Sequence, residues 1–154
     1  MTQFIRIIPL AALLMLLSIA GMAASSDADN KNPAGHLGTA SEVSRNIKVT
    51  QVDNMFLPNE IHVTEGETIR FVVINKGDRQ HEMLIGTMDD LRKVAKNRRA
   101  SPDKNPAEPG AIRLKPGEEG EIIWTFDQIG EVDFTCPLPG HFKAMRGKIY
   151  VEKK

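Results

Sequence analysis

Short apolar segments alternate with turn-forming residues along most of the chain. The apolar segments are rich in β-branched and aromatic residues, and they end at Gly, Pro or Asp positions, a pattern typical of β-strands. We expect strands at residues 47–52, 60–64, 68–75, 81–85, 120–126, 131–136 and 148–152. This close succession of short strands predicts an all-β sandwich or barrel.

One segment, residues 87–99, has the periodicity of a helix instead. Its apolar residues Met88, Leu91 and Val94 share one face, and Thr87 can cap the first turn. Residues 100–110 contain three prolines and are expected to be irregular. The sequence therefore predicts a short helix and a loop inserted between two strands of the sandwich.

Five basic residues of this predicted helix allow two interpretations. They could form a docking surface for an acidic partner, or they could line a solvated helix face. The residues are Arg92, Lys93, Lys96, Arg98 and Arg99.

The first 24 residues have the layout of a secretory signal peptide. Arg6 precedes an apolar run over residues 7–22, and small residues follow that run. The run is short for a membrane span, which needs about 20 residues, so an uncleaved anchor is the less favoured alternative. We expect a signal peptide at 1–24, a flexible, polar segment at 25–45 and a single domain at 46–154, which places the domain in the periplasm.

Charge and cysteine content narrow the classes of function. Without the predicted leader, 19 basic and 20 acidic residues remain, which argues against a nucleic-acid-binding protein. Cys136 is the one cysteine of the chain, so no internal disulfide can form. A lone thiol in an exported protein is intermolecular, reactive or bound to a ligand, and metal coordination would protect it.

Cys136 opens a segment that carries three potential metal ligands. His141 and Met145 follow it with the spacing Cys-x4-His-x3-Met, between two predicted strands. A thiolate, two imidazoles and a weak thioether form the ligand set of a mononuclear electron-transfer copper site. The second imidazole must come from elsewhere, and His81, at the start of a predicted strand, is the best candidate.

Side-chain alternation supports this arrangement. Val132, Phe134 and Cys136 share one face of the predicted strand 131–136, so the cysteine leaves that strand from its core side. Two prolines and a glycine then shape a tight loop that returns His141 to the same end of the sandwich. Such a stiff loop can hold its ligands in place whether or not the metal is bound.

The two remaining histidines are weaker candidates. His36 lies in the segment expected to be flexible, where a histidine is most often solvated, and a metal-binding role there is the minor alternative. His62 alternates with Ile61 and Val63 in a predicted strand, so we expect it to face solvent.

Each candidate ligand taken alone also has a purely structural interpretation, since a buried cysteine or methionine often fills a core and a histidine can cap a turn. Other metal and catalytic chemistries fit the combination less well. Structural zinc prefers four Cys or His ligands. A Cys–His nucleophile needs an exposed, activated thiolate, a dinuclear copper centre needs two cysteines, and a multicopper oxidase needs His-x-His pairs that this chain lacks.

From about Ile47 to Lys154 the chain resembles the cupredoxins, the family of small blue copper proteins. The Pro-Gly-His sequence at 139–141 is more similar to azurin than to plastocyanin, whereas 55–58, 66–68 and 124–126 look more like exported cupredoxin-like proteins linked to bacterial copper tolerance. The resemblance implies a Greek-key β-sandwich, one type 1 copper ion and no catalysis. The residues that match the ligand motif are His81, Cys136, His141 and Met145.

One residue departs from the family pattern. Many members carry Asn or a similar neutral residue after the first histidine ligand, whereas this chain has Glu82. An acid so close to the site is expected to favour Cu(II) and to lower the reduction potential. Met83 shares the face of His81 by alternation, and we expect it to be a core residue beside the site rather than a ligand.

Two functions are compatible with this ligand set. The first is an electron carrier that docks transiently to redox partner proteins through the surface around His141, where Leu138, Pro139 and Phe142 supply apolar contacts. The second is a periplasmic copper-tolerance protein that sequesters or oxidises copper. An adhesion-type sandwich without metal is a third possibility only if the ligand set is coincidental. In the first two cases we expect a monomer that has no stable membrane anchor.

Overall fold

The computed structural model describes residues 32–102, 104 and 106–154. The predicted signal peptide and the first part of the predicted flexible segment lie outside these residues. Within the described part of the chain, no helix has the length and apolar character that a membrane span requires.

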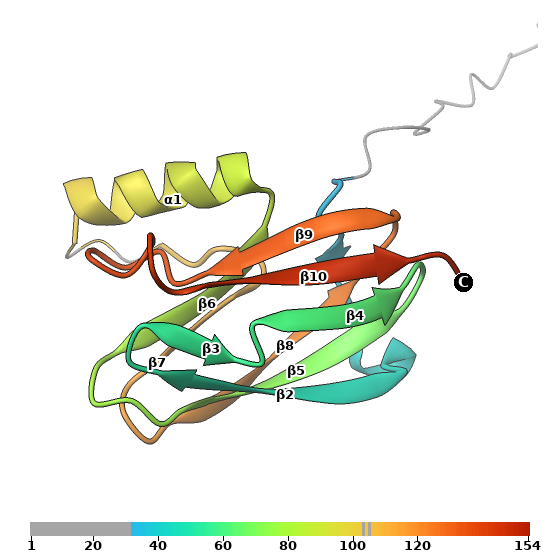
Figure 1. Ribbon diagram of the computed structural model, residues 1–154, viewed down its shortest axis with the longest axis horizontal. Coiled ribbons are helices and arrows are strands. Elements are labelled where there is room, and N and C mark those ends of the chain that lie inside the picture. The colour runs from blue at the N-terminus through green and yellow to red at the C-terminus, as the bar shows by residue number, and fades with distance from the viewer. Residues whose placement is uncertain (1–31, 103, 105) are drawn as a thin grey trace, which may run out of the picture.

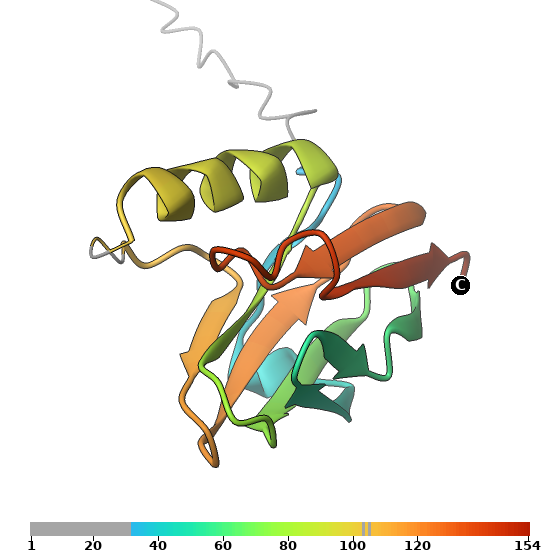
Figure 2. The ribbon, with the colours of Figure 1, turned by 60° about the vertical axis from the view of Figure 1, so that its left-hand side comes forward.

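Over the described residues, ten strands form two five-stranded sheets that pack face to face (Figures 1 and 2). In order across the first sheet, the strands are β1 (His36–Leu37), β8 (Glu119–Thr125), β5 (Thr68–Asn75), β2 (Arg45–Val52) and β3 (Met55–Leu57). In order across the second, they are β4 (Glu60–Thr64), β10 (Arg146–Glu152), β9 (Gly130–Thr135), β6 (His81–Gly86) and β7 (Ala111–Leu114). The pairs β2–β5 and β4–β10 are parallel, and the other pairs are antiparallel.

The alternation of side chains explains why these segments form a sandwich. In β4, Ile61 and Val63 are buried while His62 is exposed, and β10 buries Ile149 and Val151 in the same way. The inward side chains of the two sheets meet in one hydrophobic core, which also contains Cys136 and Met145.

The helix α1 (Met88–Ala100) joins β6 to β7 by way of an irregular segment and lies against the second sheet (Figure 1). Thr87 caps it, because its Oγ1 atom accepts a hydrogen bond from the backbone N–H of Asp90 at 3.3 Å. Leu91 and Ala95 are buried residues of the helix itself. The predicted all-β sandwich with one helical insertion is therefore confirmed.

Every residue of β6 is buried, unlike the residues of the other long strands. One face of β6 belongs to the core, and α1 lies over the opposite side of the same sheet. Because both faces of β6 are covered, the side chain of Glu82 is buried on the side of the sheet where α1 lies.

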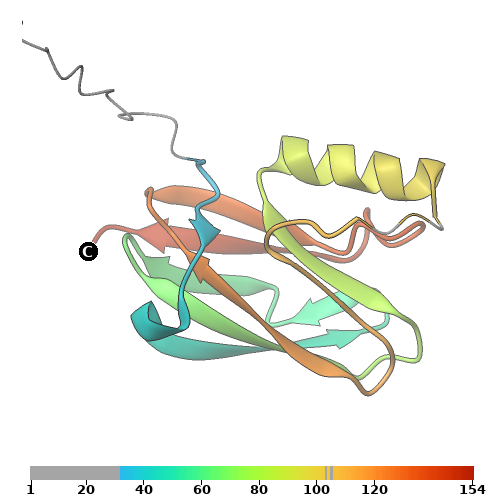
Figure 3. The ribbon, with the colours of Figure 1, turned by 180° about the vertical axis from the view of Figure 1, so that it is seen from behind.

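The segment expected to be flexible, 25–45, is described from residue 32 onward and contains local structure there. β1 pairs with β8 (Figure 3), and a 3-10 turn spans Ala40–Glu42. The Nε1 atom of Trp124 donates a hydrogen bond to the backbone oxygen of Ala34 at 2.6 Å. The structure of this segment depends on its contacts with β8, and the polar composition of the segment alone does not predict those contacts.

Candidate metal centre

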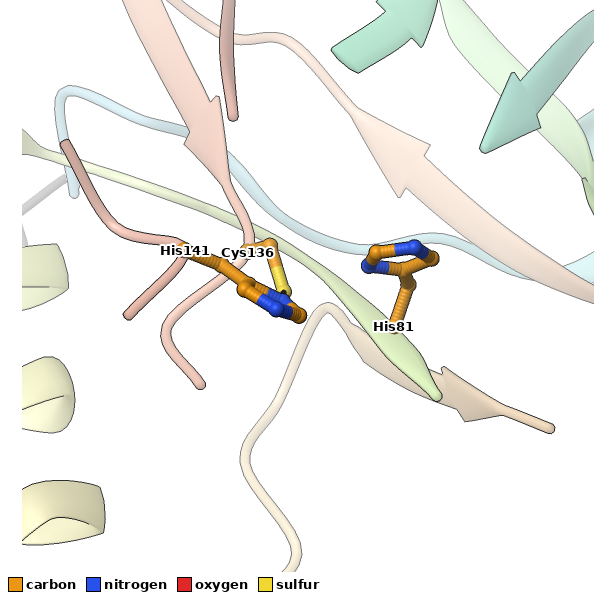
Figure 4. A group of neighbouring side chains, drawn as sticks. All are labelled: His81, Cys136 and His141. Carbon is orange, nitrogen blue, oxygen red and sulfur yellow. Dashed lines mark hydrogen bonds between the residues drawn. The ribbon is translucent and has the colours of Figure 1, made fainter. Parts of the chain in front are cut away.

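His81, Cys136 and His141 gather at one end of the sandwich (Figure 4). Their potential ligand atoms all lie within 4.8 Å of one another, and all three residues are buried. β6 begins at His81, and Cys136 directly follows the last residue of β9. Because β6 and β9 are antiparallel neighbours, the start of one strand lies near the end of the other.

Among the described residues, the polar groups beside the sulfur of Cys136 include the backbone N–H groups of Glu82 and Leu138 and the ring of His141. The backbone N–H of Glu82 points to Sγ at 3.4 Å, and Nδ1 of His141 lies 3.4 Å from the same atom. Burial raises the pKa of the Cys136 thiol to about 11. A buried thiol with a raised pKa is a poor nucleophile, so the site does not suit a Cys–His catalytic pair.

His81 is held by a carboxylate on its outer side. Its Nε2 atom lies 3.0 Å from Oδ1 of Asp53, which follows β2. The hydrogen bond with His81 is the main reason why the pKa of Asp53 is lowered, so this carboxylate is ionised and can only accept. Nε2 therefore donates the hydrogen bond, and in the neutral imidazole this tautomer leaves the lone pair on Nδ1 of His81.

That Nδ1 atom is buried and has no hydrogen-bond partner in the part of the chain that the structure describes. Buried polar atoms are nearly always paired, so an unpaired nitrogen beside a thiol and a second imidazole calls for an explanation. A bound metal ion supplies one, because a neutral imidazole whose other nitrogen donates to a carboxylate is a common metal ligand.

His141 completes the group on the solvent side. Its ring centroid lies 4.9 Å from that of His81, and its side chain is the most exposed of the three, at 9%. Burial is the main reason why the pKa of His141 is lowered, and the positive charge of Arg79 lowers it further. A neutral imidazole is the form that binds a metal.

Backbone hydrogen bonds fix the loop between β9 and β10. The N–H of His141 donates to the oxygen of Leu138 at 3.0 Å, and the N–H of Met145 donates to the oxygen of His141 at 2.9 Å. The N–H of Cys136 donates to the oxygen of Met145 at 3.0 Å, which brings the two ends of the loop together. Met145 is fully buried beside the site, and its role as the fourth, axial ligand stays a prediction.

Two imidazoles and one sulfur are the donors that select copper over harder metal ions. The buried, unpaired Nδ1 of His81 and the close approach of Sγ to His141 fit such an ion. The residues present are therefore suited to copper.

The other residues noted in the sequence lie away from these donors or in the core. Met83 is fully buried in the hydrophobic core, as expected. His36 is exposed and lies 3.3 Å from Asp127, and His62 is exposed and pairs with Glu152 at 2.7 Å.

Glu82 has charged partners that the sequence did not reveal. Its carboxylate is buried and pairs with Arg98 of α1 and Arg113 of β7, and its expected effect on the reduction potential stays a prediction. Arg98 fits neither interpretation of the basic residues of this helix. Its side chain is 3% exposed, so it belongs neither to a solvated helix face nor to a docking surface.

Sequence reasoning did not identify Asp53, Arg98 or Arg113 as neighbours of the site. Asp53 and Asn54 are residues typical of turns, so the sequence indicates a turn there. The contact of Asp53 with His81, however, joins residues 28 positions apart in the chain. No local pattern reports such a contact.

Comparisons with known proteins agree with this description. A family model described as "Cupredoxin-like domain" matches residues 9–113, a range that ends before Cys136, so the candidate ligands Cys136 and His141 depend on the geometry above. The "Copper-resistant cuproprotein CopI" of Rubrivivax gelatinosus is 44% identical over 125 residues, which are 80% of this chain and 76% of that protein. The protein of the same name from Pseudomonas aeruginosa is 28% identical and covers 96% of this chain and 97% of its own length.

Solved structures show the same fold. The structure of auracyanin B superposes with a TM-score of 0.64 at 19% identity, over 79% of this chain and 96% of that one. The reduced auracyanin of Roseiflexus castenholzii gives a TM-score of 0.61 at 26% identity, over 71% and 98% respectively.

Proposed function

Because the chain belongs to the cupredoxin-like family, we propose that it is an exported copper-resistance protein that holds one type 1 copper ion. The proposed ligands are His81, Cys136, His141 and Met145. The 44% identity to a protein named for copper resistance favours copper resistance over electron transfer. The buried cluster of two histidines and a cysteine favours copper over other metals.

The bound ion would supply reversible one-electron chemistry, and the chain's own residues would hold it and limit its access to solvent. His81 and Cys136 are fully buried, whereas the partly exposed edge of His141 offers a short path to the surface. A rigid loop between β9 and β10 keeps the donors in one arrangement, which suits tight retention of copper and electron exchange equally well. We propose no catalytic role beyond this.

Electron transfer to a partner protein is the second candidate. The partly exposed His141 supports it, because Leu138 and Phe142 lie half-buried in the same loop and could offer a small apolar contact surface. Weak, short-lived redox complexes use small interfaces of this kind. The predicted leader and the exported relatives suggested by the sequence support a periplasmic site of action for either candidate.

Deleting the gene in its source organism distinguishes the two. Copper-resistance function predicts poor growth in added copper with normal respiration, and rescue by the wild-type gene but not by Cys136→Ser. A respiratory defect at low copper without copper sensitivity would instead favour the electron carrier. If the parent strain makes the protein and the deletion strain shows neither copper sensitivity nor a respiratory defect, both candidate functions are contradicted.

A further inference from the structure

Three charged side chains form a buried cluster between α1, β6 and β7. Oε1 of Glu82 lies 3.0 Å from Nη2 of Arg98, and Oε2 accepts a hydrogen bond from Nε of Arg113 at 2.8 Å. Nη2 of Arg113 contacts the same oxygen. The exposed fractions of the three side chains are 2% for Glu82, 3% for Arg98 and 17% for Arg113.

This cluster is poorly explained by stability alone. Desolvating charged groups is expensive, and buried ion pairs are often no better for stability than apolar residues of the same size. Counted over the described residues, the cluster contains one more cation than anion, and Nε of Arg98 is buried with no hydrogen-bond partner among them. The adjacent Arg99 is exposed, so an arginine at this end of α1 does not have to be buried.

Glu82 connects the cluster to the metal centre. It follows His81 directly, and its backbone N–H points to the sulfur of Cys136 at 3.4 Å. Its side chain faces the opposite side of β6, where α1 lies over the sheet (Figure 1). One residue thus contacts the candidate copper ligand with its backbone and the helical insertion with its carboxylate.

The two arginines fix Glu82 from independent elements. Arg113 lies directly opposite Glu82 in the β6–β7 pairing. Arg98 also donates to the backbone oxygen of Pro106 at 3.1 Å, so it ties the end of α1 to the irregular segment before β7. The insertion between β6 and β7 is therefore anchored at the strand that begins with His81.

We propose that the cluster of Glu82, Arg98 and Arg113 is a positioning device for the copper centre. It holds the N–H of Glu82 against the sulfur of Cys136, and its excess positive charge favours the reduced state of the site. This inference rests on the proposed copper site. It reverses the sign expected from Glu82 alone, since a nearby cation stabilises the reduced centre, which carries one positive charge less.

The test compares Arg98→Gln with Arg99→Gln, a control that removes the adjacent, exposed charge. Reduction potential, the thiolate-to-copper absorption band and copper release to a chelator are measured on the copper-loaded proteins. Arg98→Gln is expected to shift the potential downward and to speed copper release by about tenfold, the lower end of the usual effect of groups that hold metal ligands. Arg99→Gln is expected to match the wild type in all three.

A charge-preserving variant separates positioning from charge. Arg113→Lys keeps the cation but loses the forked contact with Glu82, so it should speed copper release with little change in potential. Arg98→Lys serves the same purpose if Arg98→Gln does not fold, as judged by circular dichroism. In the metal-free protein, Arg98→Gln, Arg98→Lys and Arg113→Lys should also speed hydrogen exchange at the backbone N–H of Glu82.

Two results overturn the proposal. If Arg98→Gln and Arg113→Lys fold and show the wild-type potential, release rate and amide exchange, the cluster is only structural, while the copper site stands. If the wild-type protein itself binds no copper and shows no thiolate band, the proposed function fails and this inference fails with it.

Discussion

Oδ1 of Asp53 lies 3.0 Å from Nε2 of His81, and this contact pairs a carboxylate that is 38% exposed with an imidazole that is fully buried. The contact fixes the ring of His81 and leaves its buried Nδ1 as the free nitrogen. A neighbouring N–H supports the carboxylate, because Asp78 donates to Oδ2 of Asp53 at 3.3 Å. Asp53 therefore acts on the proposed metal centre without being a ligand.

Asp53→Ala should weaken copper binding by about 10- to 100-fold, the range typical for partners that orient a metal-bound histidine. Asp53→Asn keeps an oxygen that can accept from Nε2, so its loss should be smaller. Competition with a chelator of known affinity measures both values. Asp89→Ala, which removes an exposed acid from α1, is the control. Equal affinities for Asp53→Ala and the wild type would show that the carboxylate has no orienting role.

Gly77 is required by the close approach of its loop to this pair. A Cβ atom at position 77 would lie 2.5 Å from Oδ1 of Asp53 and 3.1 Å from Nε2 of His81. Gly77→Ala should therefore displace the carboxylate and weaken copper binding while the sandwich stays folded. Gly86→Ala is the matched control, because its Cβ would meet Leu91 at an ordinary 3.4 Å. Full copper affinity in Gly77→Ala would contradict the proposed arrangement.

Arg45 and Glu67 form an ion pair away from the metal centre. Nε of Arg45 donates to Oε1 of Glu67 at 2.6 Å, and this contact, ahead of the hydrogen bond from the backbone N–H of Thr64, lowers the pKa of Glu67. A lowered pKa in the folded state stabilises the protein above the pKa of the unfolded chain. That contribution is lost as the pH falls through the folded-state value.

Glu67→Gln should therefore reduce the free energy of unfolding at pH 7 by up to about 1 kcal/mol, as expected for a partly exposed pair. The difference from the wild type should begin to shrink as the pH falls below about 4, where Glu67 takes up a proton first in the unfolded chain and, at lower pH, in the folded protein. Urea unfolding of the metal-free protein at pH 7 and pH 3 measures this. A difference that stays the same at both pH values would refute the linkage, and Glu60→Gln, which changes an exposed carboxylate, is the control.

The gathering of three candidate ligands was predictable because each signal is local. Cys136 and His141 are separated by a short loop, and alternation in the preceding strand placed Cys136 on the core side. His81 was predicted from its position at a strand start, and the pairing of β6 with β9 brings it to the same end. The helix was predicted within one residue at each end because Thr87 and the apolar periodicity define it.

The surroundings of the site could not be predicted in the same way. The effect of Glu82 on the reduction potential was expected without its two arginine partners, since nothing local showed that α1 would place Arg98 over its strand. The strands β3 and β7 were also missed, because segments of three and four residues carry too little periodicity. Their strand conformation depends on pairing with β2 and β6, which only the folded chain provides.

Titration of the purified domain with Cu(II), followed by visible absorption, tests the central claim most directly. We predict an intense thiolate-to-copper band that grows to one equivalent of copper and is absent in Cys136→Ser. A wild-type protein that develops no such band, or a band that persists without Cys136, would contradict the account.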